Sequence, residues 1–508
     1  MNFFQEKSQS ESVLNPPILI SFSVVFFLAV VVFRGYLALH LSNDCYHLWF
    51  NIKDFPFQAS SQGRPLTGLL AFFFDRLGIN LVQYQKVFTL LGLFIYSVGI
   101  IVLSELLVKL KADDSVKFRV VAGAVSFLLV LNFFAVDMFH YTVMMLPYSL
   151  ASLLMILACR AILLEQNRFN LLKATVFLAL SVLLYQSYAA LFVPMVLIGL
   201  NLNSESALSR QEKLRRSFFG LAAYAAALAI DLAYIKLVHL NFFSDRWLDA
   251  RTSRAAPILE NLRYIFRIQD DLWISSFGLL RPYLFLAFAF VFAIAFIFCR
   301  AAIKENIRAL FFVGVSLAIF YATLFLPHVF SGEIGVSARS IAPFASVPAL
   351  LIFGFLLYQR EWFEKLNLLK FAFLSAVAAL FVAQAITINK FAAEGLAINR
   401  EDEAQARKIV ELITDYEYQT GNKINALYFK NDASPQMCRR ADCYVHAKAL
   451  AVSWSRAESV KFYTGRDFKS FEMDASDFTR LFADKNWDEF APAQQIKFEG
   501  ERAYILVF

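Results

Sequence analysis

The sequence predicts a mostly α-helical protein that crosses a membrane many times and ends in a small soluble α/β domain. Of its 508 residues, 59% are hydrophobic, only 18% are charged and 56 are phenylalanine, a usage far from that of soluble globular chains. Long apolar runs recur along residues 1–388, and about 20 apolar residues suffice to cross a bilayer. After residue 389 the composition changes abruptly to a charged mixture. We therefore expect a membrane domain over 1–388 and a soluble domain over 389–508.

The apolar runs predict about eleven membrane-spanning helices. The first run is too long for the apolar core of a signal peptide, so we expect it to be retained. Lysine and arginine gather in short connections that fall on one side if the N-terminus is cytoplasmic. Residues 172–203 must then form two short helices that meet near Tyr185-Gln186-Ser187. The expected spans are 18–38, 86–108, 118–134, 143–164, 172–185, 188–203, 217–239, 282–299, 309–327, 340–359 and 368–388.

This topology places the C-terminal domain and several connections on the outer, periplasmic face. Two predicted helices, 66–78 and 258–268, are too short or too amphipathic to span and are expected to lie along the outer leaflet. The outward connections are about 39–85, 135–142, 241–281 and 328–339.

The charge balance excludes a nucleic-acid-binding protein. The tail carries about 17 basic and 19 acidic groups, so the overall net charge of +7 belongs to the membrane domain. There it reflects the positive-inside bias, whereas a nucleic-acid surface would need a basic face with a reading motif.

The tail has its own predicted elements. Acidic residues in the first turn and a terminal glycine favour a helix over 400–421, and 424–430, 459–465 and 502–508 are typical of strands. Cys438 and Cys443 are close enough in sequence for a small loop disulfide if their compartment is oxidising.

A polar segment, residues 42–66, separates the first apolar run from the next. Asp44 lies near the outer end of the first span, and the sequence GRPL (63–66) returns the chain to the membrane surface. A carboxylate at this boundary can remove a proton from a sugar hydroxyl while an arginine holds a phosphate. A lone exposed aspartate is more often simply solvated, but its position favours sugar transfer from a lipid phosphate.

Several short motifs carry a resemblance to a known family. The pair Asn43-Asp44, the sequence GRPL before an apolar helix and LLYQSYAALFVP (183–194) resemble the phage-type O-antigen glucosyltransferases of the type II Gtr family. Arg339, directly before an apolar run, fits their pattern as well. The likeness covers roughly residues 20–390. The chain departs from the family at Asn43, where a second acidic residue is usual.

The resemblance implies a GT-C type membrane enzyme. It would move glucose or a related hexose from polyprenyl phosphate to a lipid-linked O-antigen or similar surface polysaccharide, on the periplasmic side of the bacterial inner membrane. The expected partners are therefore this donor, this acceptor and membrane lipid, with no nucleic acid. A nucleotide sugar is not needed, and a phosphate-cradling glycine-rich loop is absent from the sequence. No cofactor is assigned; a divalent metal is left open.

The predicted catalytic groups are two carboxylates. Asp44 is expected to act as the general base on the acceptor hydroxyl. Asp137 is expected to orient the acceptor or complete the site, with His140 nearby, although ordinary solvation at a helix end would also explain it. A metal site would need both carboxylates, because one does not hold a divalent ion.

Further residues are predicted to bind substrate. Arg64 and Arg339 adjoin spans at the outer face and are expected to hold the phosphate, with headgroup contact as the alternative. For the other residues predicted to bind substrate, the alternative is packing against neighbouring side chains. They are Asn43 and His47 beside Asp44, His140 near Asp137, and Tyr185 and Gln186 at the tip of the short helical pair.

Two other protein classes remain open from sequence alone. A flippase for a lipid-linked glycan would line a cavity with Arg34, Asp231 and Lys236, and should show two similar halves, which the sequence lacks. A scaffold protein would depend on its tail and not on Asp44.

Overall fold

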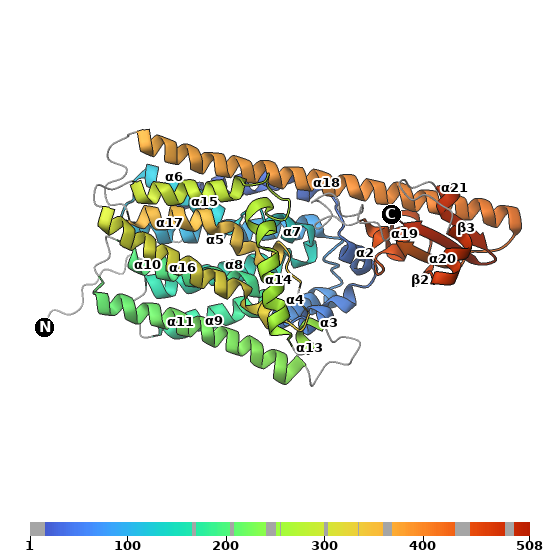
Figure 1. Cartoon of the computed structure of the whole chain (residues 1–508), viewed down its shortest axis with the longest axis horizontal. Helices are drawn as coiled ribbons and strands as arrows, with labels where there is room; N and C mark the ends of the chain where they lie inside the picture. Colours follow the sequence, from blue (N-terminus) through green and yellow to red (C-terminus); the bar gives the residue numbers. More distant parts are fainter. Residues whose placement is uncertain are drawn as a thin grey trace.

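The computed structural model describes most of the chain. An elongated helical bundle occupies one end of the molecule and a small sheet the other, with one long helix running along both (Figure 1). Cys299, Cys438 and Cys443 lie outside the described part. The described residues are 16–164, 169–203, 208–239, 250–254, 256–298, 303–333, 335–358, 368–431, 448–482 and 492–507.

Each expected span contains a helix. Six helical stretches among the described residues are long and apolar enough to cross a bilayer by length and composition, so the protein is a multi-pass membrane protein; the count of eleven remains a prediction. The helices are α1 (Pro16–Val32), α5 (Gln85–Lys111), α6 (Val116–Val130), α8 (Met145–Leu163), α9 (Asn170–Leu184), α10 (Phe192–Asn201), α11 (Arg210–Ala233), α15 (Leu284–Phe298), α16 (Ile303–Val329), α17 (Val347–Tyr358) and α18 (Leu368–Thr420).

The predicted break in residues 172–203 is confirmed. Tyr185 has an extended backbone (φ −163°, ψ 115°) and separates α9 from the 3-10 helix η4 (Gln186–Leu191), which leads into α10. A broken helix inside an apolar bundle needs new partners for its freed backbone groups. Thr67 supplies one, because its hydroxyl donates to the carbonyl of Leu184 at 2.8 Å.

Short helices gather at the end of the bundle that faces the sheet (Figure 1). The two helices expected along the outer leaflet are present as α4 and α14, and α14 exposes Leu259 and Phe266. The short elements are η1 (Arg34–Leu37), α2 (Asn43–Phe50), η2 (Ile52–Asp54), α3 (Phe55–Ser61), α4 (Pro65–Arg76), α7 (Ala135–His140), η3 (Thr142–Met144), η5 (Tyr234–His239), α13 (Ala250–Ser253), α14 (Ile258–Arg267), η7 (Asp271–Ser275) and η8 (Arg339–Ser346).

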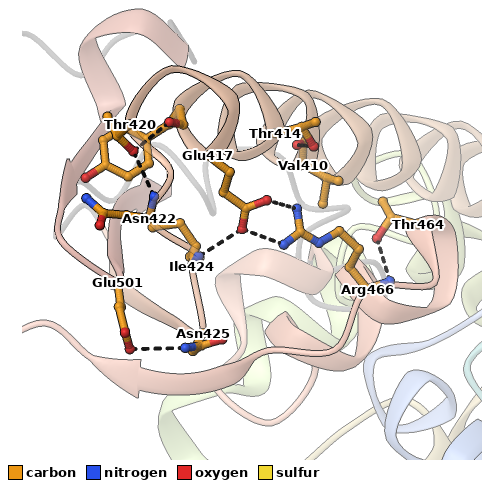
Figure 2. A network of polar contacts seen from close by, with 11 residues as sticks. Val410, Thr414, Glu417, Thr420, Asn422, Ile424, Asn425, Thr464, Arg466 and Glu501 are labelled. Atoms are coloured by element: carbon orange, nitrogen blue, oxygen red, sulfur yellow. Dashed lines mark hydrogen bonds and ion pairs between the residues drawn. The ribbon is translucent and has the colours of Figure 1, made fainter.

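Helix α18 joins the two ends without a break. Its 53 residues span about 80 Å, well beyond the roughly 30 Å of a hydrocarbon core. The helix expected over 400–421 is present, but it is the last two fifths of α18 and not a separate element. Figure 2 shows its attachment to the sheet domain: Glu417 accepts hydrogen bonds from Arg466 at 2.8 and 3.1 Å and from the backbone N–H of Ile424 at 2.8 Å.

The C-terminal domain contains a mixed four-stranded sheet in the order β2-β1-β4-β3. Strand β1 pairs in parallel with β2 and β4, and β3 pairs antiparallel with β4. Its core is separate from that of the bundle and includes residues of α18. The elements are β1 (Ala426–Asn431), η11 (Ala449–Ala451), α19 (Arg456–Thr464), β2 (Lys469–Glu472), α20 (Ala475–Phe482), α21 (Pro492–Gln495), β3 (Ile496–Glu499) and β4 (Arg502–Val507).

The strand predictions for the tail are partly right. The strands at 424–430 and 502–508 are confirmed as β1 and β4, but the strand predicted at 459–465 is wrong, because this segment forms most of α19. Gly465 ends the helix with φ 75°, a backbone conformation that glycine adopts without strain. Val460 and Tyr463 both pack against the domain core, and Tyr463 also contacts the core of the bundle. Residues three positions apart share one face of a helix, whereas they would point to opposite faces of a strand.

Candidate active site

A buried ion pair lies at the centre of the candidate site. Asp137 in α7 is 1% exposed, and its two oxygens accept hydrogen bonds from Arg339 Nη1 at 3.0 Å and from the Arg339 backbone N–H at 2.9 Å. The connection 135–142 is therefore no open loop, and solvation does not explain Asp137. Asn132 holds η8 in place through the carbonyl of Ala342 at 3.0 Å. The pair joins segments 202 positions apart.

Arg64 lies against the break between α9 and η4. Its guanidinium carbon is 4.7 Å from the centre of the Tyr185 ring, a distance at which a cation is attracted to the ring face. Gln186 donates to the carbonyl of Gly63 at 2.9 Å. Gly63 has φ +78°, and a Cβ there would lie 3.2 Å from Ile235. The glycine of the GRPL motif thus lets the chain turn tightly onto the helix break.

Three arginines converge on this region. Burial, above all, lowers the pKa of Arg64, and the positive charges of Arg251 and Arg339 lower it further. Arg64 nevertheless stays charged near neutral pH, since the guanidinium pKa is so high. Its Nε is buried and has no hydrogen-bond partner among the residues described. An anion entering here would meet an unsatisfied donor and a positive field.

Aromatic and acidic side chains complete the cluster. Tyr148 packs edge-on against Tyr185 with ring centres 4.4 Å apart, and the Arg339 guanidinium lies 3.8 Å from the centre of the Tyr141 ring. Asp231 of α11 is buried beside the side chain of Gln186. The cluster therefore offers hydroxyl, amide and carboxylate groups beside the three cations.

Asp44 lies in the first turn of α2, at the border of this cluster. An acidic residue is favourable at a helix N-terminus, and Ser42 precedes the helix with an extended backbone. The next residue, Cys45, has its sulfur 3.7 Å from the hydroxyl of Thr142, so α2 contacts the segment that carries Tyr141. Asp44 itself accepts a hydrogen bond from Trp454 Nε1 at 3.0 Å.

The other predicted residues lie around Asp44 and Asp137. Asn43 begins α2 and is half-buried. His47 lies 3.7 Å from a carboxylate oxygen of Glu458. His140 is buried and stacks on His40 with ring centres 6.0 Å apart. Both ring nitrogens of His40 lie within 3.0 Å of backbone carbonyls, which gives that histidine a structural role.

The structure thus brings Arg64, Asp137, Tyr185, Gln186 and Arg339 into one cluster, with the α2 residues at its edge. Among the described residues, no group of three or more His, Cys, Asp or Glu side chains could hold a metal ion. Sequence reasoning missed several members. Tyr141, Tyr148 and Arg251 carry no motif, and Trp454 lies 410 positions from its partner Asp44.

An arginine-rich cluster at one end of an apolar helical bundle characterises this multi-pass membrane protein; Arg64 and Arg339 are half-buried and Arg251 is exposed. A family model described as glucosyl transferase GtrII matches residues 36–359. The chain belongs to this family and is therefore a membrane hexosyltransferase that uses a sugar donor and an acceptor. No curated protein matches the chain. The match includes the elements from α2 to α17 and ends before the C-terminal domain.

Proposed function

We propose that this glucosyltransferase takes glucose, or a related hexose, from a polyprenyl-phosphate donor and adds it to a lipid-linked O-antigen or similar polysaccharide on the periplasmic side. One observation carries this proposal: the helix of Asp44 contacts Thr142 through Cys45 at 3.7 Å, directly beside Tyr141, whose ring centre lies 3.8 Å from the Arg339 guanidinium. A sugar attached to a lipid phosphate would present its reactive carbon at the end of a membrane-spanning bundle.

Arg64 is proposed as the main contact of the donor phosphate. Asp137 already neutralises much of the Arg339 charge, whereas Arg64 keeps an unsatisfied buried Nε. Arginine binds phosphate through its planar fork of N–H donors. Arg251 and Arg339 would add positive potential, and Tyr185 would keep the guanidinium of Arg64 in place. The Tyr185 hydroxyl and the amide oxygen of Gln186 are then proposed to contact sugar hydroxyls, since the Gln186 nitrogen already donates to Gly63.

Asp44 is proposed as the general base in preference to Asp137. Both oxygens of Asp137 are held by Arg339, so this carboxylate orients the arginine. Asp44 accepts one hydrogen bond from Trp454, and a carboxylate has about four lone-pair sites. Asp44 can therefore still accept a proton from a substrate hydroxyl.

The proposed reaction is a direct displacement at the anomeric carbon. Asp44 takes the proton of the acceptor hydroxyl, the freed oxygen bonds to C1 of the hexose, and the bond from C1 to the phosphate oxygen breaks. The electron pair leaves with polyprenyl phosphate. Arg64 and its neighbours stabilise the charge that develops on this phosphate, which lowers the barrier.

The proposal is tested by Asp44→Asn in a strain of defined O-antigen, with the repeat unit analysed by mass spectrometry. Removal of a general base costs roughly 100- to 10,000-fold in rate, so the added hexose should disappear. Asp75→Asn, on α4 and half-buried like Asp44, is the matched control and should keep the modification. Full modification by Asp44→Asn would exclude this residue as the base.

The flippase interpretation finds less support. Of the three charged residues that it needs, Arg34 and Lys236 are exposed and only Asp231 is buried. A flippase would also leave unmodified lipid-linked glycan on the cytoplasmic side when inactivated, which lipid analysis of the same strains would detect.

A further inference from the structure

We infer that the C-terminal domain completes the acceptor side of the active site, and that Trp454 is a stacking platform for a sugar ring of the polysaccharide acceptor. The inference rests on the proposed role of Asp44. It assigns substrate recognition to a part of the chain beyond residue 359, where the match to the family ends.

The C-terminal domain is firmly docked on α2. Tyr46 is fully buried, and its hydroxyl lies 2.6 Å from the hydroxyl of Tyr463 and 3.4 Å from a carboxylate oxygen of Asp402. Trp49 packs edge-on against Phe462 with ring centres 4.8 Å apart. Apolar, aromatic and polar contacts thus hold α19 against the helix that carries Asp44.

Helix α18 adds a second line of attachment. The side chain of Asn399 accepts a hydrogen bond from the Leu41 backbone N–H at 2.8 Å and donates to the Leu41 carbonyl at 2.9 Å. Asp402 accepts a hydrogen bond from the Ala449 N–H at 3.0 Å. The segment before α2 and the segment before Trp454 are therefore fixed to the same helix.

Trp454 itself is held at its indole nitrogen and is otherwise an exposed residue. Its backbone lies between η11 and α19, where buried Ser455 donates to the carbonyl of Ala449 at 2.6 Å. The indole N–H points to Asp44, yet 57% of the residue is exposed. A large apolar ring left exposed in a well-anchored turn suits a ligand with an apolar face.

A pyranose ring has such a face. The indole face is electron-rich and attracts the slightly positive edges of C–H groups, which a sugar presents between its hydroxyls. A sugar stacked on Trp454 would lie next to Asp44, the proposed base. The donor phosphate is expected on the other side, at Arg64, so the acceptor is the substrate that fits here.

The full-length protein in detergent tests this inference. Transfer from glucosyl phosphoryl polyprenol to O-polysaccharide purified from the host strain is measured while each substrate is varied. Trp454→Ala should raise KM for the polysaccharide about 3- to 10-fold, the range of one aromatic contact, with the donor KM unchanged. Trp454→Phe keeps a ring and should retain most of the acceptor affinity.

Tyr418→Ala provides the matched control, because Tyr418 is a highly exposed aromatic residue of the same part of the chain and should leave both KM values unchanged. Tryptophan fluorescence gives a readout without turnover: the polysaccharide should change the emission of the wild type and not that of Trp454→Phe. An unchanged acceptor KM in Trp454→Ala would overturn the inference, whereas absence of transfer by the wild type would overturn the proposed function instead.

Discussion

At the scale of single residues, the buried pair of Asp137 and Arg339 organises the site. An isolated buried charge is costly, so such a pair is stable only when both partners are present. The backbone N–H of Arg339 adds a second hydrogen bond to Asp137. The pair thereby fixes the start of η8 against α7 and positions the guanidinium over Tyr141.

A double-mutant cycle tests this pair. Arg339→Gln should lower the free energy of unfolding by about 3–5 kcal/mol, because it leaves the buried carboxylate of Asp137 unpaired. Asp137→Asn should cost less, because the side chain of Arg339 is 29% exposed. The double variant should lose much less than the sum of the two, because it leaves no unpaired charge. Thermal unfolding of purified protein in detergent provides the comparison, and additive losses would contradict the coupling.

His47 gives the docking of the C-terminal domain a pH dependence. The carboxylate of Glu458, 3.7 Å from the ring, raises the pKa of His47. The charges of Asp54 and Asp44 raise it further, and burial opposes them. A group whose pKa is higher in the folded protein than in the unfolded chain stabilises the folded, docked state. This contribution is complete below the unfolded pKa of about 6.5 and is lost as the pH rises through the folded pKa.

Limited proteolysis at pH 6 and pH 8 measures this effect. Release of the C-terminal domain from wild-type protein should be faster at pH 8, and His47→Gln should remove the difference between the two values after correction for protease activity on a model peptide. A wild type that is cleaved equally at both values would contradict the role of His47.

At the scale of elements, α18 determines how the C-terminal domain is placed. It passes very close to η1, because a Cβ on Gly35 would lie only 2.5 Å from the Cβ of Ala392. Real Cβ atoms do not approach so closely, so only glycine allows this contact. The C-terminal end of the first predicted span and the helix that carries the tail are thereby joined directly.

Gly35→Ala should therefore force α18 away from η1 and lower thermal stability, at a cost of about 1–3 kcal/mol for overpacking. Ala392→Gly should rescue it by removing the facing methyl group. Gly123→Ala, where a Cβ meets nothing within 4 Å, is the control and should be neutral or slightly stabilising. Equal melting temperatures for Gly35→Ala and Gly123→Ala would show that the helices can separate at no cost.

At the scale of the whole molecule, the orientation in the membrane decides which substrates can reach the site. The short helices and the C-terminal domain share one end of the bundle (Figure 1). The basic residues between Lys109 and Arg119 lie where α5 meets α6, and Arg210–Arg216 form the first turns of α11. By the positive-inside rule, these helix ends should be cytoplasmic. The site would then open to the periplasm, as the proposed function requires.

Cysteine labelling tests the orientation in a variant that lacks the five native cysteines. Glu333→Cys, in the exposed connection before η8, should react with a membrane-impermeant maleimide in intact spheroplasts. Asp114→Cys, whose parent side chain is 77% exposed, should react only after permeabilisation. The reverse pattern would place the candidate site in the cytoplasm.

Features that depend on local sequence were predictable. The apolar runs predicted the positions of the membrane helices. The basic residues on both flanks of 172–203 predicted the break near Tyr185, because hydropathy and charge depend directly on the surrounding solvent. Strands β1 and β4 followed from their β-branched and aromatic residues. The strand predicted at 459–465 was wrong, because so short an apolar segment fits a helix or a strand equally well.

The sequence by itself determined the protein class, the helix positions and a set of polar residues near the outer ends of the spans. Only the tertiary structure decided how these residues combine. Asp137 pairs with Arg339, the charge of Arg251 acts on Arg64, and Trp454 donates a hydrogen bond to Asp44 from 410 positions away. The reason is physical. Hydropathy and propensity depend on neighbouring residues, whereas the partner of a polar group depends on how distant helices pack.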